Sequence, residues 1–567
     1  MFRYKKYLKI GIHGIGAIAI IAVAVLLRVL LIIQGWPGMS SDEGTMGLEA
    51  MHITYRGELP VFFYGQSYMG TIEAYLAAGA YRLFGVSSFS LRLGMVFLFA
   101  LFLLVMYLLA RLLFTKNVAL LSIALLCFGS SETFMRQLKA VGGDLETMLF
   151  GPLMLLLATW LALSFHSDTT LRDRKKRFVT YGCLGLVMGL AIWSHMLVLP
   201  FVLMTLLLLF LFCRSEIRTR ATLWLLIGLF IGLLPLLIFN VEHPDQNAII
   251  TLWKLHTSGG TTASLPYTFW DQILGTVLIS VPQATGASPL CPITTSVGSW
   301  DQQISSCMIF QGSWGVGFLV LLVIATIIAI RVLPGWRTIV NSSVSQAPED
   351  RQQLVLHTAR LLLLGAALLT LLAYLFSPAP AIVPVTSSRY LVALLVATPA
   401  LLWPLCSHIR LARPISFSSF LSALKVGILL FIFVVFIGAT VSVFQQIPST
   451  QSITQQENAL IDDLLHIHAI HIYSDYGTCD RLIFQSDERI ICSVLDIDLQ
   501  TGQNRYPPYD TIVENDPNAA YAFPVGSPQD ETFIEMMRSS SIKYQHLSFE
   551  GYDVYQPESV GRIHLNS

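Results

Sequence analysis

Residues 88–112 read SFSLRLGMVFLFALFLLVMYLLARL, and no charged side chain interrupts the run from Gly94 to Ala110. A helix needs about 20 apolar residues to cross the hydrocarbon core of a bilayer. The whole chain of 567 residues is 54% hydrophobic and 12% charged, with a mean hydropathy of +0.64. Soluble domains carry about 25% charged residues. The composition therefore excludes a soluble globular protein, a disordered chain and a nucleic-acid-binding protein.

Similar apolar runs recur along the first 445 residues. We predict eleven spans, at 10–33, 88–112, 116–131, 144–165, 179–195, 196–213, 221–239, 314–333, 359–377, 390–406 and 426–445. The first run is too long for the apolar part of a cleavable signal peptide, so we expect it to remain as a span. The sequence thus predicts an all-α polytopic membrane domain over residues 1–445 and a separate domain over residues 446–567.

The basic residues indicate how the chain is oriented. With the N-terminus in the cytoplasm, 21 of the 29 basic residues before residue 446 fall in cytoplasmic segments, and 12 of the 17 acidic residues fall outside. This is the distribution that the positive-inside rule describes. Eleven spans then place the C-terminal domain outside the cell membrane. That domain carries 18 acidic and 6 basic residues, which offset the excess of basic residues before it and give a net charge of zero.

Two external segments are too polar to be spans. Residues 34–87 contain two helix-like stretches, Asp42–Arg56 and Ser67–Phe84, which we expect to lie in the outer membrane interface as amphipathic helices. Residues 240–313 form a long loop rich in Thr, Ser and Gly, and loops of this length are usually functional or mobile.

The C-terminal domain alternates apolar runs with helical patterns. The apolar runs lie at 469–473, 481–484, 490–494, 519–523 and 552–555, and the helical patterns lie at 454–467 and 529–540. Alternating strands and helices predict a small α/β or α+β domain.

Four of the eight cysteines are on the predicted external side. They form two local pairs, Cys291 with Cys307 and Cys479 with Cys492. An oxidising compartment would make these pairs two disulfides, whereas a reducing one would leave four free thiols.

Acidic residues open two of the predicted external helices. Asp42 and Glu43 follow Ser40 and Ser41, and a serine cap with acids in the first turn stabilises a helix by about 1 kcal/mol. Capping is the simpler interpretation, but carboxylates are costly at a membrane face, and a capped helix start is also a rigid mount for a catalytic carboxylate.

Two further groups of charged residues lie on the same external side. Asp144 and Glu146 open the span at 144–165, close to Lys139. The helix dipole explains acids at this position but leaves the lysine unexplained. Arg389 and Tyr390 begin the span at 390–406. The arginine is either a snorkelling anchor or a cation that holds a phosphate at headgroup depth.

An ordered set of motifs resembles one family of membrane enzymes. The densest part contains Ser41-Asp-Glu-Gly, Leu48-Glu-Ala, Tyr64-Gly-Gln-Ser-Tyr-Met-Gly-Thr-Ile-Glu-Ala-Tyr and Phe84-Gly-Val-Ser-Ser-Phe-Ser-Leu-Arg-Leu; residues 185–195, 232–244 and 388–391 add to it. The set resembles the GT-C glycosyltransferases, and within them the bacterial relatives of protein O-mannosyltransferases, aminoarabinose transferases and lipopolysaccharide-core galacturonosyltransferases.

The resemblance implies transfer of a sugar from a polyprenyl phosphate to an extracytoplasmic glycan, lipid or protein. Asp42 matches the catalytic aspartate of the family's first loop and is expected to be the general base, with Glu43 orienting it or holding a sugar hydroxyl. A departing phosphate needs cations rather than an acid. Arg389 would bind it with Lys139 as a helper. A single displacement would invert the anomeric centre.

The family's second acidic position maps to Asp144 or to Glu146. This chain has Gly142-Gly143-Asp144 there, where relatives often carry an arginine or a Tyr-Pro pattern. Further candidates for substrate binding are Tyr64, Gln66, Glu73, Arg92, His195 and Tyr390. Arg92 matches a family arginine that also suits a structural role. His195 suits a packed, hydrogen-bonded histidine.

The sequence requires no cofactor. Some relatives bind a divalent cation near the first-loop acids, but no His/Cys cluster here demands a metal. Two alternatives to an enzyme are a polytopic transporter and a non-catalytic relative that binds a partner. No inverted repeat or pair of broken helices, the features typical of transporters, is found in the sequence.

Overall fold

The computed structural model of the chain describes residues 11–165, 171–217, 219–248, 250–251, 267–286, 306–333, 348–406, 417–539 and 543–558. The chain forms two compact units. Unit 1 comprises Met1–Arg28, Val96–Gln137 and Gly143–Gln445, and unit 2 comprises Val29–Met95, Leu138–Gly142 and Gln446–Ser567. Unit 2 therefore joins the first external loop to the C-terminal domain, whereas we predicted that loop to be part of the membrane domain.

Within the described ranges, nine helices or helix runs are long and apolar enough to cross a membrane. They contain α1 (Ile12–Ile33), α4 (Ser88–Leu113), α7 (Asp144–Leu163), α8 (Leu171–Ser194), α11 (Arg220–Glu242), α15 (Ser306–Val332), α17 (Pro348–Leu375), 3-10 helix η7 (Ser388–Ala397) with α20 (Thr398–Cys406), and α21 (Phe417–Gln445). The prediction of an all-α polytopic membrane domain is confirmed.

The other two predicted spans are also apolar helices, but of different form. The span at 116–131 falls on α5 (Lys116–Leu126) and α6 (Ser131–Leu138), which meet at a bend of 92°. The span at 196–213 falls on the short run of η3 (Met196–Val198) and α9 (Leu199–Phe212). Hydropathy locates such segments but says nothing of their bends.

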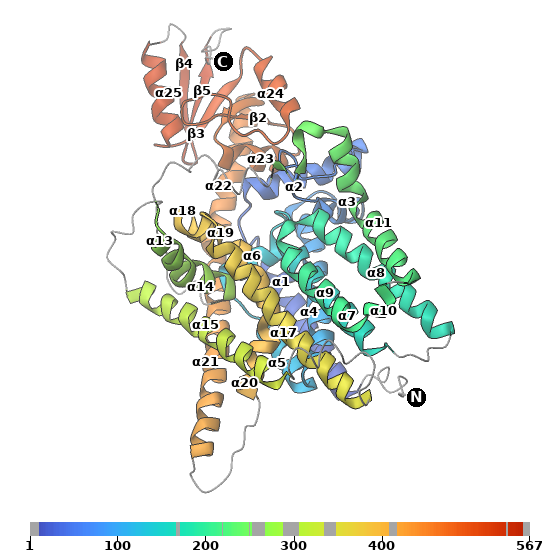
Figure 1. Cartoon of the computed structure of the whole chain (residues 1–567). Coiled ribbons are helices and arrows are strands. Elements are labelled where there is room, and N and C mark those ends of the chain that lie inside the picture. The colour runs from blue at the N-terminus through green and yellow to red at the C-terminus, as the bar shows by residue number, and fades with distance from the viewer. Residues whose placement is uncertain are drawn as a thin grey trace. The chain divides into compact units, whose positions relative to one another are not determined.

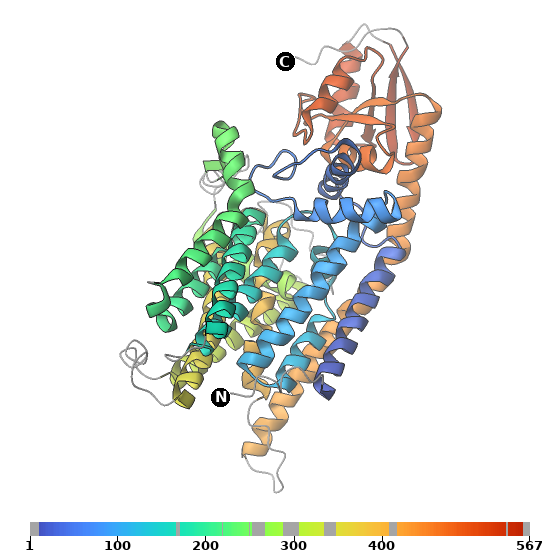
Figure 2. The same cartoon turned by 90° about the vertical axis from the view of Figure 1, so that its right-hand side faces the viewer.

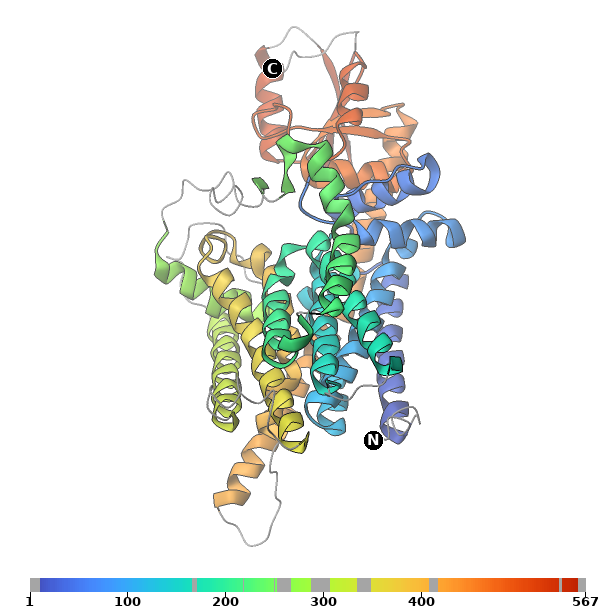
Figure 3. The same cartoon turned by 45° about the vertical axis from the view of Figure 1, so that its right-hand side comes forward.

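The long helices of unit 1 pack side by side. Helix α8 packs along α11, α7 contacts α8 and α9, and α17 contacts α9 and α15 (Figures 1 and 3). Their outer faces keep apolar side chains exposed, among them Phe230 of α11 and Val320 of α15. Lipid tails are as apolar as these side chains, so a helix in a bilayer has no reason to hide them.

The predicted long loop is partly helical. It contains α13 (Phe269–Leu274), the π-helical η6 (Gly275–Ser280) and α14 (Val281–Thr285). Thr268 and Asp271 begin α13 with a reciprocal capping box. Cys291, one of the predicted disulfide partners, lies outside the described residues. The remaining short helices of unit 1 are α10 (Arg214–Ile217), η4 (Pro244–Gln246), α18 (Ala379–Ile382) and α19 (Pro384–Ser387).

The C-terminal part of unit 2 is built around a five-stranded sheet that follows α22 (Ile447–His466) (Figure 2). The elements after α22 are β1 (His471–Ser474), α23 (Tyr476–Gln485), β2 (Ile491–Val494), α24 (Pro507–Glu514), β3 (Ala520–Pro524), α25 (Pro528–Ser539), β4 (Tyr544–Phe549) and β5 (Tyr552–Pro557). The strand order is β2-β1-β3-β5-β4. Strand β1 is parallel to β2 and β3, and β5 is antiparallel to β3 and β4.

This sheet confirms the predicted α/β domain but corrects one strand. The apolar run at 481–484 lies in helix α23, because Cys479, Leu482 and Ile483 follow the helical spacing and bury one face. Strand β4 was not predicted. None of its residues is buried, and its half-buried and exposed positions do not alternate regularly, so its sequence carries little strand signal.

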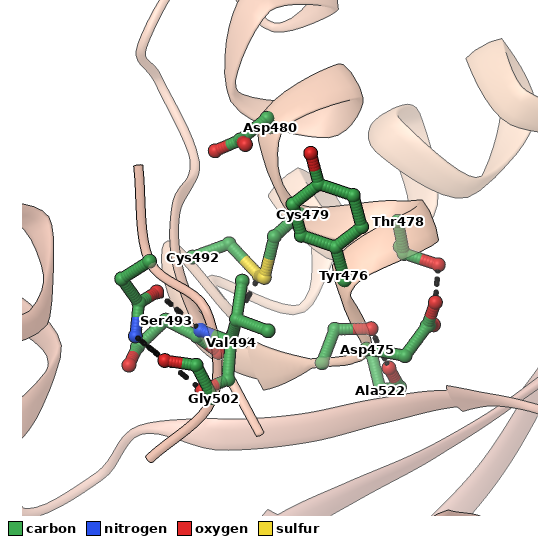
Figure 4. Close-up of a disulfide and its surroundings, with 12 residues drawn as sticks. Asp475, Tyr476, Thr478, Cys479, Asp480, Cys492, Ser493, Val494, Gly502 and Ala522 are labelled. Atoms are coloured by element: carbon green, nitrogen blue, oxygen red, sulfur yellow. Dashed lines mark hydrogen bonds between the residues drawn. A yellow bond between two sulfur atoms is a disulfide. The ribbon is translucent and has the colours of Figure 1, made fainter. Parts of the chain in front are cut away.

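A disulfide joins Cys479 of α23 to Cys492 of β2, with 5.2 Å between their Cα atoms. It ties the crossover helix of the β1–α23–β2 unit to the strand that follows. Figure 4 shows the Tyr476 hydroxyl and the Asp480 carboxylate on one side of α23, away from the disulfide. Residues four apart share a helix face, so α23 presents these two polar groups together.

The first external loop forms α2 (Ser41–Met51), a π-helical turn η2 (His52–Arg56) and α3 (Ile72–Phe84). Helix α2 differs from the expected interfacial helix, because every residue except Asp42 is buried. It packs against α23. A Cβ on Gly44 would lie 2.7 Å from the Asp480 carbonyl oxygen, so the close approach requires glycine. A helix buried on all sides has no free apolar face to place in a membrane.

Candidate active site

The residues proposed from the sequence fall into two groups, one in each unit. Unit 2 holds Asp42, Glu43, Tyr64, Gln66, Glu73, Arg92 and Lys139, and unit 1 holds Asp144, Glu146, His195, Arg389 and Tyr390.

Asp42 is held at one of its two carboxylate oxygens. The Tyr476 hydroxyl donates to Oδ1 at 2.5 Å, and Nη2 of Arg505 donates to the same Oδ1 at 2.7 Å. The side chain of Asp42 remains 32% exposed. Within the described residues, both hydrogen bonds fall on Oδ1, so Oδ2 is left to a group from solution.

Helix capping does not account for the position of Asp42. Ser40 is the N-cap of α2, but its side chain makes no capping hydrogen bond. The neighbouring hydroxyl, on Ser41, donates instead to the carbonyl oxygen of Tyr476 at 2.5 Å. The start of α2 is thus fixed by a hydrogen bond from Ser41 to the C-terminal part of unit 2 rather than by a serine cap.

Arg505 is the centre of this arrangement. Its side chain is 4% exposed. Besides Asp42 it donates to the Tyr476 hydroxyl from Nε at 3.0 Å and from Nη2 at 2.6 Å. With the Gln66 amide turned so that its oxygen faces the guanidinium, that oxygen accepts from Nη1 at 2.7 Å. Burial alone would lower the pKa of Arg505, but its interactions with the Tyr476 oxygen and the Asp42 carboxylate raise it, so the guanidinium stays charged.

Tyr476 acts as a hydrogen-bond donor. Burial first, and then the nearby Asp42 carboxylate, raise the pKa of its phenol. The phenol therefore keeps its proton and can donate it to Oδ1. Neither Tyr476 nor Arg505 was predicted from the sequence, because each lies more than 400 positions from Asp42 and in no recognisable motif.

The same face of α23 makes a further hydrogen bond with α2. Oγ1 of Thr45 donates to Oδ2 of Asp480 at 2.8 Å. Burial raises the pKa of Asp480 to about 6, although the Thr45 hydrogen bond opposes this shift. Asp480 is a buried link between the helices.

Glu43 and Arg92 form a closed ion pair. Nε and Nη2 of Arg92 donate to Oε1 and Oε2 of Glu43 at 2.7 and 2.6 Å, and the side chains are 2% and 0% exposed. Both carboxylate oxygens are occupied, so Glu43 is not free to hold a sugar hydroxyl. The pair fastens α2 to the start of α4.

The remaining first-loop candidates have internal partners. Glu73 is buried and accepts from the backbone N–H of Gly142 at 3.0 Å. The half-buried Tyr64 donates to Glu58 at 2.7 Å. Lys139 is half-buried in the segment Leu138–Gly142.

A second polar network in unit 2 was not predicted. The buried imidazole of His52 contacts Glu488 at 3.2 Å, Tyr509 at 3.1 Å and Tyr64 at 3.0 Å. Burial opposes ionisation of Glu488, but hydrogen bonds from His52 and Tyr509 lower its pKa to about 2. Like Arg505, this network joins the first loop to the C-terminal domain.

Unit 1 holds an acidic helix start beside two arginines. Asp144 is the first residue of α7, and Nη1 of Arg136 lies 3.9 Å from its Oδ2. Arg136 also donates to Glu132 at 3.2 Å. A small pocket is lined by Glu132, Thr133, Arg136, Gln283, Ala284, Ser388, Arg389 and Val392. Arg136 and Arg389 therefore face one small cavity, and Arg136 was not among the predicted residues.

The other candidates of unit 1 surround this helix start. Nδ1 of His195 accepts from the backbone N–H of Leu197 at 3.1 Å, the packed and bonded state expected of it. Gly143 precedes α7 with a φ of +82°, and a Cβ there would lie 2.4 Å from the His195 ring. Glu146 is buried, and the half-buried Tyr390 stacks near the Arg389 guanidinium at 5.2 Å.

Known proteins share this architecture. Residues 71–239 match the sequence model of the family described as dolichyl-phosphate-mannose-protein mannosyltransferase. The fold matches ArnT from Cupriavidus metallidurans bound to undecaprenyl phosphate, with a TM-score of 0.56 and 12% identity over 96% of this chain and 99% of that one. The chain has the GT-C fold. The resemblance to the GT-C glycosyltransferases is thus confirmed.

A second GT-C structure agrees. The apo oligosaccharyltransferase of Archaeoglobus fulgidus matches with a TM-score of 0.51 and 13% identity, over 91% of this chain and 70% of that one. No curated protein sequence matches the chain.

The first-loop acids do not suit the divalent cation that some GT-C relatives bind. Both oxygens of Glu43 and Oδ1 of Asp42 are occupied by guanidinium groups. Over the part of the chain that the structure describes, no three His, Cys, Asp or Glu side chains gather as metal ligands would.

Proposed function

We propose that this GT-C protein transfers a sugar from a polyprenyl-phosphate donor to an extracytoplasmic acceptor, a glycan, lipid or protein, with Asp42 as general base. The observation that carries the proposal is the one-sided anchoring of Asp42. Oδ1 is fixed by Arg505 and Tyr476, and the exposed carboxylate keeps Oδ2 for the acceptor. A base must be both held and accessible to reach its proton.

The reaction needs one displacement. The acceptor oxygen forms a bond to the anomeric carbon while the bond from that carbon to the phosphate oxygen breaks. The acceptor proton passes to Oδ2 of Asp42, and the lipid phosphate leaves with the bonding electron pair. Attack opposite the leaving group inverts the anomeric centre, and no covalent enzyme intermediate is required.

We assign the donor phosphate to the pocket of unit 1. Arg389 and Arg136 line it, and arginine matches phosphate oxygens in a two-pronged geometry. A phosphate that departs charged is stabilised by cations already in place. Lys139 stays a candidate helper by resemblance alone.

The proposed topology has the N-terminus in the cytoplasm and the C-terminal domain outside the cell membrane. Basic residues in alternate loops support it. An alkaline phosphatase fused after residue 446 should be active in intact cells. An active cytoplasmic reporter at the same position would overturn this topology.

Replacement of Asp42 tests the base. Purified protein in detergent is given radiolabelled undecaprenyl-phosphate mannose, glucose, galactose and arabinose in turn, with and without cell-envelope acceptors. Asp42→Asn should reduce release or transfer of the label by roughly 10²- to 10⁴-fold, the usual contribution of a general base. Asp516→Asn is the matched control, because Asp516 pairs with His471 away from this site. Full activity of Asp42→Asn would end the assignment.

Replacement of the two arginines tests the phosphate pocket. Arg389→Gln and Arg136→Gln should raise the KM for the active lipid-phosphate sugar by about tenfold or more and weaken inhibition by undecaprenyl phosphate, because each removes a charge-assisted hydrogen bond. Arg220→Gln, at an exposed helix start, is the control. Unchanged inhibition would place the phosphate elsewhere.

A further inference from the structure

We propose that Tyr476 and Arg505, both from the C-terminal domain, are positioning residues that hold the carboxylate of Asp42. The C-terminal domain is then part of the catalytic site. The inference rests on the proposed role of Asp42. It gives the C-terminal domain a part in the reaction that no motif in its sequence indicates.

The two oxygens of the Asp42 carboxylate have different surroundings. Tyr476 and Arg505 both donate to Oδ1, at 2.5 and 2.7 Å. The two donors are also bonded to each other, since Arg505 donates twice to the Tyr476 hydroxyl. A carboxylate fixed in this way cannot rotate about its last bond without losing both contacts. Oδ2 is therefore held in one orientation, in which it can accept a proton.

The donors are themselves held by rigid structure. Tyr476 is the first residue of α23, and its carbonyl accepts from Ser41, the residue before Asp42. The Cys479–Cys492 disulfide ties α23 to β2, and Thr45 binds Asp480 one turn after Tyr476. A catalytic group works best when the residues around it are fixed by packing and further hydrogen bonds.

The two residues have different effects on Asp42. Arg505 brings a buried positive charge and a donor to Oδ1, whereas Tyr476 is neutral and brings a donor alone. Loss of Tyr476 removes an orienting contact without removing the charge. Loss of Arg505 should therefore lower the rate more than loss of Tyr476.

The test compares two variants with two matched controls in the full-length protein. Arg505→Gln and Tyr476→Phe remove the contacts to Asp42. Arg481→Gln removes the arginine of the Arg481–Glu457 pair, and Tyr555→Phe removes a buried Tyr–Asp hydrogen bond of 2.7 Å to Asp530, both within unit 2. Each site variant should lower kcat by roughly 10- to 100-fold, while the controls stay near the parent. The loss should fall on kcat rather than on KM, and Arg505→Lys, which keeps the charge, should restore part of the rate.

A second measurement does not depend on activity. Labelling of Asp42 by a water-soluble carbodiimide with glycine ethyl ester, followed by mass spectrometry at one fixed pH, reports how readily the carboxyl reacts. Labelling should be faster in Arg505→Gln, which frees the carboxylate, and stay unchanged in Arg481→Gln. An unchanged labelling rate together with parental kcat in both site variants would overturn the inference. If Asp42→Asn stays active while the labelling rate rises, the proposed base fails but the anchoring stands.

Discussion

Two helices of this protein begin with acidic residues, and the surroundings of those acids differ. At the start of α2, each acid has an arginine within hydrogen-bond distance, Arg505 for Asp42 and Arg92 for Glu43. At the start of α7, the described cation nearest to Asp144 is Arg136 at 3.9 Å, which is too long for a hydrogen bond. The sequence pattern is the same in both places, so an acid at a helix start does not reveal its own role.

The difference lies in what covers each helix. Helix α2 packs against α23, and a buried acid there needs a close partner. Helix α7 begins beside a small pocket lined by Arg136 and Arg389. Acids that are hydrogen-bonded to arginines, as in α2, are suited to hold a catalytic group in position. An acid without such a bond, beside a pocket lined by arginines as in α7, leaves those arginines able to bind an anion from outside. Four measurements would sharpen or break this contrast.

The largest effect is expected from the closed ion pair. Glu43→Gln leaves Arg92 buried without a charged partner and should lower the free energy of unfolding by about 3–5 kcal/mol. Thermal unfolding in detergent micelles measures this loss against Glu535→Gln, an exposed glutamate of α25. Asp144→Asn should cost much less, because it breaks no hydrogen-bonded pair. Equal losses in the two variants would remove the contrast between the helices.

Loss of the disulfide should have the second largest effect on stability. Replacing both Cys479 and Cys492 by Ser opens a loop with a sequence separation of 13. A loop of about 15 residues corresponds to about 3 kcal/mol of stability. Chemical unfolding of the double variant should show this loss, together with reduced transfer because α23 carries Tyr476. Cys183→Ser, at a free cysteine, is the control. Parental transfer in the double variant would show that α23 needs no tether.

Replacement of Asp480 should have a smaller effect, and at neutral pH it should raise stability rather than lower it. Its pKa is raised to about 6 in the folded protein, so its stabilising contribution is complete below about pH 4 and is lost as the pH rises through 6. At pH 7.5 the buried charge opposes folding, and Asp480→Asn should raise stability by about 1 kcal/mol. Melting temperatures at pH 4 and 7.5 test the sign. A destabilised variant at pH 7.5 would mean that the ionised form has a stronger partner than Thr45.

The smallest effect is expected at the N-cap of α2. Ser40→Ala should change stability by less than about 0.5 kcal/mol, because the serine makes no capping bond. Thr115→Ala is the comparison, since Thr115 accepts from the Val118 backbone N–H and caps α5. Its loss should cost about 1 kcal/mol. Equal costs would restore capping as the reason for Ser40.

The sequence predicted the elements but not their partners. Hydropathy located all eleven apolar segments, because a bilayer demands long apolar runs wherever a helix crosses. It missed the bend between α5 and α6, and it gave α23 a strand at Arg481–Phe484 because a run of three apolar residues after Arg481 fits either structure. Asp42 was singled out by its place in the first loop. Arg505 and Tyr476 were not, since no spacing rule links residues more than 400 positions apart.

By itself the sequence determined the membrane architecture, the α/β domain and the family resemblance, because composition, period and motif order are local properties of the chain. Only the tertiary structure decided which acid is closed off and which is accessible. Glu43 and Asp42 are adjacent, yet one has both oxygens bound by Arg92 and the other has one oxygen bound by residues of the C-terminal domain. The role of a carboxylate depends on what surrounds it in space, and those neighbours come from distant parts of the chain.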